Sequence, residues 1–430
     1  MIKVVKFGGS SLASAEQFAK VGKIIQADKE RRYVVPSAPG KRNAKDTKVT
    51  DMLYACYALV EAEEDFRVPL MKIKDRYDTI INGLNLKLSL EEEFKKISEN
   101  FKNKAGVDYA ASRGEYLNGI IMANYLGYEF VDAAEVIFFE EDGTFDAEKT
   151  NKVLAKRLEK CERAVIPGFY GALPDGTIKT FSRGGSDITG SIVARAVHAT
   201  CYENWTDVPG ILAADPKIVK RPAPIETLSY PELQLLSAAG TQVLHESAVA
   251  PVRERQIPLH IRSTFAPDAP GTRIGFDAPA SLSASGVIGF AGRRPVSMLR
   301  VIFPENTEET ALLEVRACLN EHRIETFHSA CGVEGLCLLL SSGAEADALH
   351  AAAEQLRERF PDAKVKLREN LAVLLALCRS TKDIPKLSAA IEASGAPVHH
   401  LVQTPPGAMF CVNDSQYEQA LRAAYGAAFA

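Results

Sequence analysis

Short β-rich runs alternate with helical runs throughout residues 1–280, and this alternation restricts the possible folds of the chain more than any other feature. After the capping serine Ser14, residues 15–27 repeat apolar side chains at helical spacing. Four runs bounded by Gly, Pro, Asn or Asp are predicted to be strands, at residues 4–7, 33–37, 163–166 and 201–205. We therefore expect an α/β domain with a mainly parallel central sheet and helices on both faces.

Proline, glycine, serine and aspartate cluster in residues 265–285, which predicts a domain boundary there. More than one core also fits the length of 430 residues, because single hydrophobic cores stop growing near 250–300 residues. Beyond this boundary the order strand, helix, strand, strand, helix, strand is expected twice. We expect a first domain at 1–280, followed by two ferredoxin-like βαββαβ modules at 286–370 and 371–430.

The expected elements of the two modules follow from apolar periodicity and turn residues. The first module has predicted helices at 309–321 and 344–360 and predicted strands at 297–303, 324–329, 336–341 and 364–367. The second has predicted strands at 371–378, 398–403 and 409–412 and predicted helices at 384–394 and from residue 414.

Composition argues against several partners and locations. The formal net charge of −4 gives no electrostatic reason to expect nucleic acid or an acidic membrane as a partner. No stretch approaches the ~18 apolar residues that span a bilayer, and no signal peptide is expected where a strand runs directly into glycines. The 8 cysteines are scattered without a CxxC pair, which is typical of reduced thiols. We expect a soluble, cytoplasmic protein.

Residues 6–11 read Lys-Phe-Gly-Gly-Ser-Ser and lie where the first predicted strand meets the first helix. Gly8 and Gly9 let backbone N–H groups approach an oxyanion, and a helix start adds partial positive charge. Lys6 is expected at the carboxyl end of a parallel strand, where its ammonium can neutralise a phosphoryl group in transit. The run matches neither GxGxxG nor the P-loop pattern. A tight turn with a solvated lysine would have the same sequence.

Residues 182–187 read Ser-Arg-Gly-Gly-Ser-Asp and begin another predicted helix. The glycine pair again suits an anion, and the guanidinium of Arg183 can hold a carboxylate through two hydrogen bonds. The carboxylate of Asp187 can orient a lysine. An ordinary capped helix would explain Ser186 and Asp187 but leaves the Arg-Gly-Gly run unexplained.

Three further segments carry polar side chains at expected strand ends or helix starts. Residues 206–211 read Thr-Asp-Val-Pro-Gly-Ile and are followed by Asp-Pro-Lys at 215–217, although Pro-Gly alone indicates only a type II turn. A basic loop follows Ser37 and leads to Thr50, as in a lid over phosphates or in any solvated loop. Glu115, in Ser-Arg-Gly-Glu, could bind an ammonium or favour the start of a helix.

Taken in order, these segments resemble the aspartate kinase family of the amino-acid kinase superfamily, which carries tandem ACT domains at the carboxyl end. The resemblance covers nearly all of residues 1–275. Residues 6–11 resemble the KFGG[TS]S signature, and residues 182–187 resemble the SRGGSD segment. The remaining three resemble the substrate-loop, SxGE and nucleotide segments. The resemblance implies the amino-acid kinase fold followed by two ACT modules.

The resemblance also implies a reaction and a set of roles. The γ-phosphoryl group of ATP would pass to the side-chain carboxylate of L-aspartate, giving 4-phospho-L-aspartate and ADP in the first step of lysine, threonine and methionine biosynthesis. Catalytic roles are implied for Lys6 and Asp187. Substrate contacts are implied for Ser37, Thr50, Glu115 (ammonium), Arg183 (α-carboxylate) and Ser186. Nucleotide contacts are implied for Gly8, Gly9, Ser10, Thr206, Asp207, Leu212 and Lys217, with Mg²⁺ bound through the phosphates and no protein ligand to metal.

This chain departs from the family pattern at several positions. Leu212 stands where some members carry Tyr. Lys217 and Gln242 stand where they carry Arg and then Lys. The loss of the cation at Gln242 weakens the assignment of phosphate contacts that the resemblance implies, but not the activity. The basic loop at residues 41–49 resembles a subset of the family, and we interpret it as a lid. The carboxyl-terminal modules resemble ACT domains only faintly, and imply lysine or threonine as an effector and a homodimer or dimer of dimers.

Two other functions compete with this interpretation. A sister kinase acting on glutamate or acetylglutamate shares the fold, but the Thr-Asp-Val-Pro-Gly and Ser-Arg-Gly-Glu segments disfavour it. A non-catalytic amino-acid sensor is disfavoured because Lys6, Arg183 and Asp187 are all present. We expect no fused homoserine dehydrogenase, since no dinucleotide-binding segment follows the modules.

Overall fold

The computed structural model describes the chain except for residues 183, 241–243, 245, 277–285, 305–308, 333–334, 342, 344, 405 and 430. It divides the chain into two compact units. The first comprises Met1–Ile211, Glu226–Tyr230 and Val243–Pro279, and the second comprises Leu212–Ile225, Pro231–Gln242 and Ala280–Ala430. The boundaries 1–280, 286–370 and 371–430 stay a prediction. No helix among the described residues is long and apolar enough to cross a bilayer.

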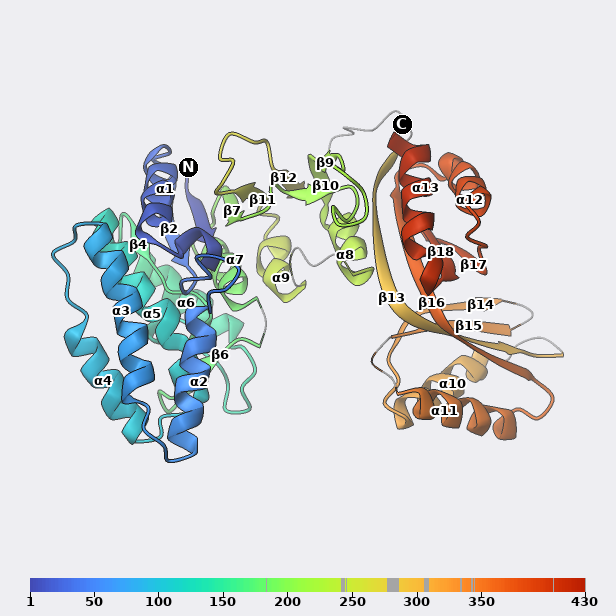
Figure 1. Cartoon of the computed structure of the whole chain (residues 1–430), viewed down its shortest axis with the longest axis horizontal. Coiled ribbons are helices and arrows are strands. Elements are labelled where there is room, and N and C mark those ends of the chain that lie inside the picture. The colour runs from blue at the N-terminus through green and yellow to red at the C-terminus, as the bar shows by residue number, and fades with distance from the viewer. Residues whose placement is uncertain are drawn as a thin grey trace. The chain divides into compact units, whose positions relative to one another are not determined.

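The first unit is built on an eight-stranded sheet in which neighbouring strands run parallel, except that β11 and β12 pair antiparallel (Figure 1). Its strands, in spatial order, are β10 (Thr227–Ser229), β12 (Thr272–Gly275), β11 (Leu259–Ser263), β7 (Cys201–Thr206), β1 (Lys3–Phe7), β2 (Arg31–Pro36), β4 (Ala164–Val165) and β3 (Glu129–Phe130). The expected α/β fold is therefore confirmed. Strand β12 lies inside the segment that the sequence analysis interpreted as a boundary.

Helices pack on both faces of this sheet. The helices of the first unit are α1 (Ala15–Gln26), α2 (Val49–Glu61), α3 (Arg67–Gly83), α4 (Glu91–Lys102), α5 (Val107–Leu126), α6 (Ala147–Leu158), α7 (Gly185–Ala196) and α9 (Glu246–Glu254). Its short elements are the 3₁₀ turns η1 (Gly9–Leu12) and η2 (Ala133–Glu135) and the hairpin strands β5 (Tyr170–Ala172) and β6 (Ile178–Thr180). Strands β8 (Ile211–Leu212) and β9 (Pro224–Ile225) pair with each other, and α8 spans Tyr230–Ala238.

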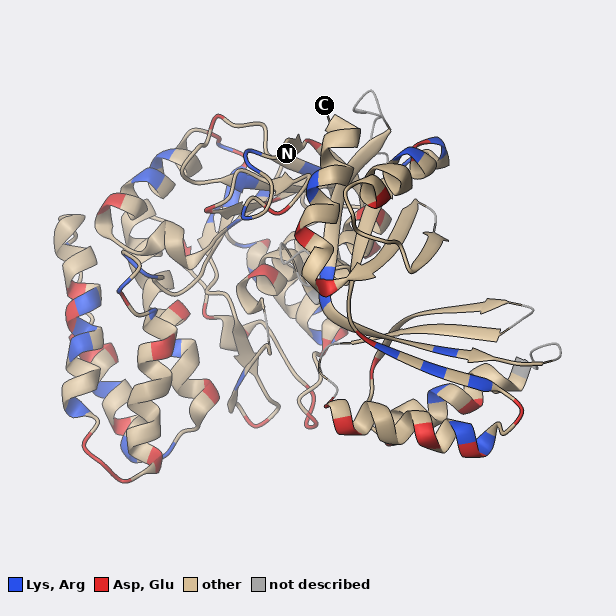
Figure 2. Cartoon of the chain, turned by 45° about the vertical axis from the view of Figure 1, so that its right-hand side comes forward, with Lys and Arg blue, Asp and Glu red and all other residues tan. Residues whose placement is uncertain are grey.

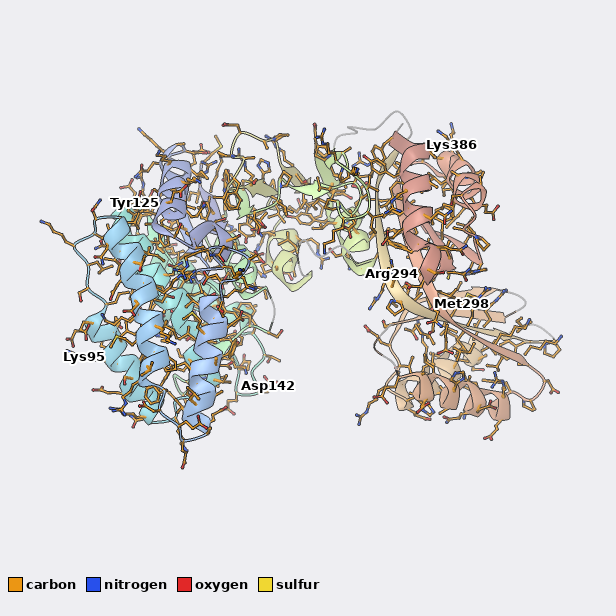
Figure 3. The ribbon with its side chains drawn as sticks, in the orientation of Figure 1. Lys95, Tyr125, Asp142, Arg294, Met298 and Lys386 are labelled. Carbon is orange, nitrogen blue, oxygen red and sulfur yellow. The ribbon has the colours of Figure 1, made fainter. Side chains whose placement is uncertain are left out.

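Helices α1, α2, α3, α4 and α5 share one core with one face of the sheet. Helix α4 shows why: Phe94, Ile97 and Phe101 recur at helical spacing and are buried in that core. Lys95, between them, lies on the outer surface and pairs with Glu92 (Figure 3). The prediction of an amphipathic helix after Ser14 is also confirmed, because the backbone N–H of Gln17 donates to the Ser14 hydroxyl.

Alternation along β1 separates the core from the site. Val5 and Phe7 point into the core shared with α1 and α5, so Lys6 points to the opposite face, where α7 packs against β1. On the neighbouring strand β7, Trp205 points into the same core as Phe7 and stacks on it at 5.9 Å. Trp205, the largest side chain of this core, is fully buried.

The core side of β7 also carries a buried ion pair. Arg31 Nε lies 2.9 Å from Glu203 Oε2, and both side chains are at least nine-tenths buried. The indole N–H of Trp205 donates to the same carboxylate, 2.8 Å away. Removing one partner of such a pair leaves an uncompensated charge in the core, which costs far more than the pair itself contributes.

The second unit contains one antiparallel six-stranded sheet in the order β14-β15-β13-β16-β18-β17 (Figure 1). Its strands are β13 (Val287–Ile302), β14 (Thr326–Gly332), β15 (Gly335–Leu340), β16 (Lys364–Cys378), β17 (His400–Thr404) and β18 (Gly407–Asn413). Its helices are α10 (Glu309–Glu321), α11 (Ala346–Arg359), α12 (Ile384–Ala393) and α13 (Tyr417–Phe429), with 3₁₀ turns η3 (Thr381–Asp383) and η4 (Asp414–Gln416).

Two long strands are shared by both ferredoxin-like halves of this sheet. The carboxyl-terminal part of β13 pairs with β15, whereas its amino-terminal part pairs with the end of β16. The amino-terminal part of β13 therefore serves as the fourth strand of the second half, although it precedes the first half in the chain. The start of β16 shows period-2 alternation, with Lys364, Lys366 and Arg368 exposed and Val365 buried between them (Figure 2).

The buried pair on β7 yields a stability prediction. Arg31→Met is expected to lower the free energy of unfolding by about 3 kcal/mol, because Glu203 loses its closest cation inside the core. The matched control is Arg32→Met on the same strand, where the side chain donates to the carbonyl of Glu162 at the surface. In the control, the free energy of unfolding is expected to fall by less than about 1 kcal/mol. Urea unfolding of both variants checks this, and equal small losses would contradict it.

Candidate active site

Lys6 and Asp187 meet on the α7 side of the sheet. Lys6 is the penultimate residue of β1, and Asp187 lies in the first turn of α7, which begins after Gly184. Their closest atoms, Lys6 Nζ and Asp187 Oδ1, lie 2.6 Å apart. Gly184 has a φ of 59°, in the left-handed region that glycine adopts at low cost. The sequence interpretation had Asp187 orienting a lysine; the structure brings the two residues into direct contact.

Asn204 completes this pair and was missed by the sequence analysis. It is the register partner of Lys6 on the adjacent strand β7, so both side chains point to the same face. Its side-chain amide donates to Asp187 Oδ1 at 2.8 Å, and the Tyr202 hydroxyl donates to the Asp187 backbone carbonyl at 3.0 Å. A signal was available in the sequence, because Asn204 is an uncharged polar residue inside a run that was predicted to be a strand.

A pocket of about 540 Å³ lies in the first unit, and it is lined by Glu115, whose carboxyl is influenced by the charge of Lys6. Its volume is in the range of small-molecule sites. Six residues that the sequence analysis assigned to substrate or nucleotide line it: Gly9, Ser10, Ser37, Thr50, Glu115 and Asp207. Lys41 and Lys48 of the basic loop also line it, so cationic side chains surround part of the pocket.

Glu115 is the buried acid of the pocket. It lies in the third turn of α5, not at the start of that helix, so the alternative of a helix-start role is wrong. Burial raises the pKa of its carboxyl to about 8, partly offset by the backbone N–H of Ala38 and by the charge of Lys6. Among the described residues, its Oε2 atom has no hydrogen-bond partner.

Asn118, one turn after Glu115 on α5, supports the wall of the pocket. Its side-chain amide donates to the backbone carbonyl of Ser37 at 2.6 Å. The two residues share a helix face because they are three positions apart. This spacing of buried polar residues was readable in the sequence, but the sequence analysis did not use it.

The two loops that line the pocket approach each other closely. The backbone N–H of Gly40 donates to the carbonyl of Gly9 at 2.8 Å. A Cβ atom on Gly40 would lie 2.5 Å from the Gly9 carbonyl carbon, so only glycine fits there. The glycine run at residues 8–9 therefore serves a close backbone contact with the Ser37 loop as well as access for a ligand.

The remaining predicted residues are placed as follows. Gly8 is near Lys6 Nζ, since a Cβ on it would lie 3.8 Å from that atom. Ser186 is buried against Gly168, and the Thr206 hydroxyl contacts Asp207 at 3.2 Å. Leu212 and Lys217 belong to the second unit. Arg183 and Gln242 lie outside the described residues, so their predicted roles, like the others, stay predictions.

Known proteins with similar sequence and structure were compared with this chain. Residues 1–263 match the model of the amino acid kinase family. The chain is 31% identical over its full length to aspartokinase 3 of Bacillus subtilis, of which it covers 99%. The crystal structure of Clostridium acetobutylicum aspartate kinase is 38% identical with a TM-score of 0.87, covering 99% of both chains. Escherichia coli aspartokinase III in complex with aspartate and ADP shares the fold, at 22% identity, a TM-score of 0.76 and full coverage of both chains.

The raised pKa of Glu115 predicts how stability depends on pH. The carboxyl holds a proton in the folded state up to about pH 8 and releases it near 4.5 when unfolded. Between these values the folded state binds more protons, so this group's contribution to stability is full below pH 4.5 and is lost as pH rises through 8. Glu115→Gln is expected to remove this component of the pH dependence.

The measurement is chemical unfolding of the ligand-free protein at several pH values from 5 to 9. The control is Glu61→Gln, which replaces an exposed glutamate at the end of α2 and is expected to keep the wild-type pH dependence. The same pH slope in wild type and Glu115→Gln would contradict the assignment of a buried, protonated acid.

Proposed function

Because this chain belongs to the amino acid kinase family and matches its aspartokinases over its full length, we propose that the pocket beside Lys6 and Asp187 holds L-aspartate for phosphorylation by ATP. The chain is an aspartate kinase. It transfers the γ-phosphoryl group of ATP to the side-chain carboxylate of L-aspartate, giving 4-phospho-L-aspartate and ADP. The observation that supports the site is the contact of Lys6 with Asp187 next to a pocket containing buried Glu115.

The chemistry fits a site without a general base. A carboxylate is already a nucleophile at neutral pH, so catalysis reduces to positioning and charge stabilisation. Lys6 neutralises charge that develops on the transferring phosphoryl group, and Asp187 and Asn204 hold its ammonium in place. The amino-terminal end of α7 adds a partial positive charge on the same side.

The acceptor amino acid binds at the side of the pocket that is lined by Ser37, Thr50 and Glu115. Its ammonium pairs with Glu115, whose carboxyl must lose its proton when the cation binds. Ser37 and Thr50 complete the pocket, while Arg183 holds the α-carboxylate and Ser186 makes a further contact with the substrate. The raised pKa of Glu115 in the empty pocket therefore couples substrate binding to proton release.

The nucleotide lies toward the carboxyl end of β7. Gly8, Gly9 and Ser10 approach its phosphates, and Thr206 and Asp207 contact the rest. The nucleotide contacts that the resemblance implies for Leu212 and Lys217 stay predictions. Mg²⁺ is proposed to bind through the nucleotide phosphates, with no protein ligand to the metal. Bound there, Mg²⁺ would neutralise phosphate charge during transfer.

The second unit is the regulatory part. Its two ferredoxin-like halves act as ACT modules that bind lysine or threonine, and thereby regulate the first step of lysine, threonine and methionine biosynthesis by feedback. Lysine is the leading candidate. A cytoplasmic homodimer or dimer of dimers is the expected setting.

Release of ADP by the purified protein tests the function. With Mg-ATP, we expect turnover with L-aspartate and little with L-glutamate or N-acetyl-L-glutamate, and a response to added lysine or threonine. Lys6→Ala is expected to lower kcat by about 10²–10³ while circular dichroism stays unchanged. The control Lys3→Ala, at the other end of β1, removes a surface pair with Asp28 and should leave turnover intact.

Two outcomes would overturn the proposal. Turnover with another acid instead of L-aspartate would assign the chain to a sister kinase. Folded protein that binds ATP but turns over none of the three acids would favour a sensor.

A further inference from the structure

Helix α3 carries a buried arginine that the active-site description does not use. Arg76 is 5% exposed, although it lies in a helix with many exposed polar residues. Its Nη2 atom donates to the backbone carbonyl of Gly40 at 2.7 Å and to that of Ala13 at 3.5 Å. The next residue, Tyr77, donates its hydroxyl to the carbonyl of Gly114 at 2.8 Å. Helix α3 therefore holds three backbone segments that border the pocket.

Arg76 also fixes the basic loop through Asp46. Its Nη1 atom lies 2.8 Å from Asp46 Oδ2. The same carboxylate accepts from the backbone N–H and the guanidinium of Arg42, at 2.9 Å for Nε and 3.1 Å for Nη2. These arginines hold the pKa of Asp46 well below its usual range. The loop is thus closed on itself by Arg42 and tied to the helical core by Arg76.

The contact with Gly40 reaches the pocket directly. Gly40 donates its N–H to the Gly9 carbonyl at 2.8 Å, and both glycines line the pocket. Ala13, the other carbonyl partner of Arg76, directly follows the η1 turn that begins at Gly9. One guanidinium therefore bridges the loop after β1 and the loop after β2, which form adjacent walls of the pocket.

Arg76 does not itself line this pocket. Together with Arg42 and Asp46 it lines a separate cavity of about 350 Å³. We propose that Arg76 is a positioning residue for the acceptor pocket. It fixes Gly40 and Gly9, and through Asp46 it holds the loop that carries Lys41 and Lys48 into the pocket.

This inference rests on the proposed function for its kinetic test, but not for its structural test. Displacement of a site by about 1 Å can cost on the order of 100-fold in rate, so loss of the bridge should be visible in kinetics. Lysine cannot replace Arg76, because one ammonium lacks the fork that reaches Gly40, Ala13 and Asp46 together.

The kinetic test compares Arg76→Met, Arg76→Lys and Asp46→Asn with wild type. We expect Arg76→Met to raise the KM for L-aspartate about 10-fold or more, and Asp46→Asn about threefold, with smaller changes in the KM for ATP. The double variant should be no worse than Arg76→Met, because both changes release the same loop. The control Arg67→Met, at the exposed start of α3, should match wild type.

Amide hydrogen exchange gives a second readout that needs no substrate. In wild type the amides of Gly40, Arg42 and Val49 donate hydrogen bonds. Arg76→Met and Arg76→Lys are expected to speed exchange in residues 40–49 on the order of 10-fold, and Arg67→Met to leave it unchanged.

A merely structural role for Arg76 predicts a different pattern. The KM for L-aspartate would stay unchanged while kcat fell with the fraction of folded enzyme, and exchange in residues 40–49 would be no faster than elsewhere. Either result would overturn the proposal. If Arg76→Met does not fold, Arg76→Lys and Asp46→Asn are judged by the same criteria. If the wild-type protein shows no turnover, that result counts against the proposed function alone. Amide hydrogen exchange in residues 40–49 still decides the role of Arg76.

Discussion

The contact between Lys6 and Asp187 is the interaction on which the site depends. It requires β1 to carry, next to its carboxyl end, a lysine that points away from the core, and α7 to begin opposite it. The parallel sheet meets the first requirement through alternation, since Phe7 is buried on the opposite face. Gly184 meets the second by turning the chain into α7 in a left-handed conformation. Asn204, in register with Lys6, then fixes the carboxylate between them.

A second constraint is the close contact of the two glycine loops. Gly9 and Gly40 touch through their backbones, which brings the ends of β1 and β2 together and leaves a pocket bounded by α5. Because both residues are glycines, neither has a side chain that could fix this backbone contact. Its geometry depends on groups outside the pocket. Arg76 and Asn118 hold the carbonyls of Gly40 and Ser37, and Tyr77 holds that of Gly114 in α5.

The sequence predicted the parts of this structure that have local signals. Glycines at a strand end and the start of a capped helix are readable within a few residues, so Lys6 and Asp187 were proposed as site residues. Glu115 was proposed from the resemblance of its Ser-Arg-Gly-Glu segment, and its place inside α5 was not predicted. Arg76 was missed because its partners lie 36 and 63 positions away. The first half of β13 was missed as well, since its Gly289 and Gly292 are poor strand formers and its partner β16 lies far along the chain. Tertiary pairing decides such segments, not local propensity.

The central claim is that Lys6 and Asp187 act as one unit in phosphoryl transfer. A double-mutant cycle of Lys6→Met and Asp187→Asn on kcat, with folding checked by circular dichroism, tests it most directly. The account predicts that each single variant loses about 10²–10³-fold in kcat and that the double variant loses no more than about threefold beyond the weaker single variant. Losses that multiply in the double variant would contradict it, because the two residues would then act independently.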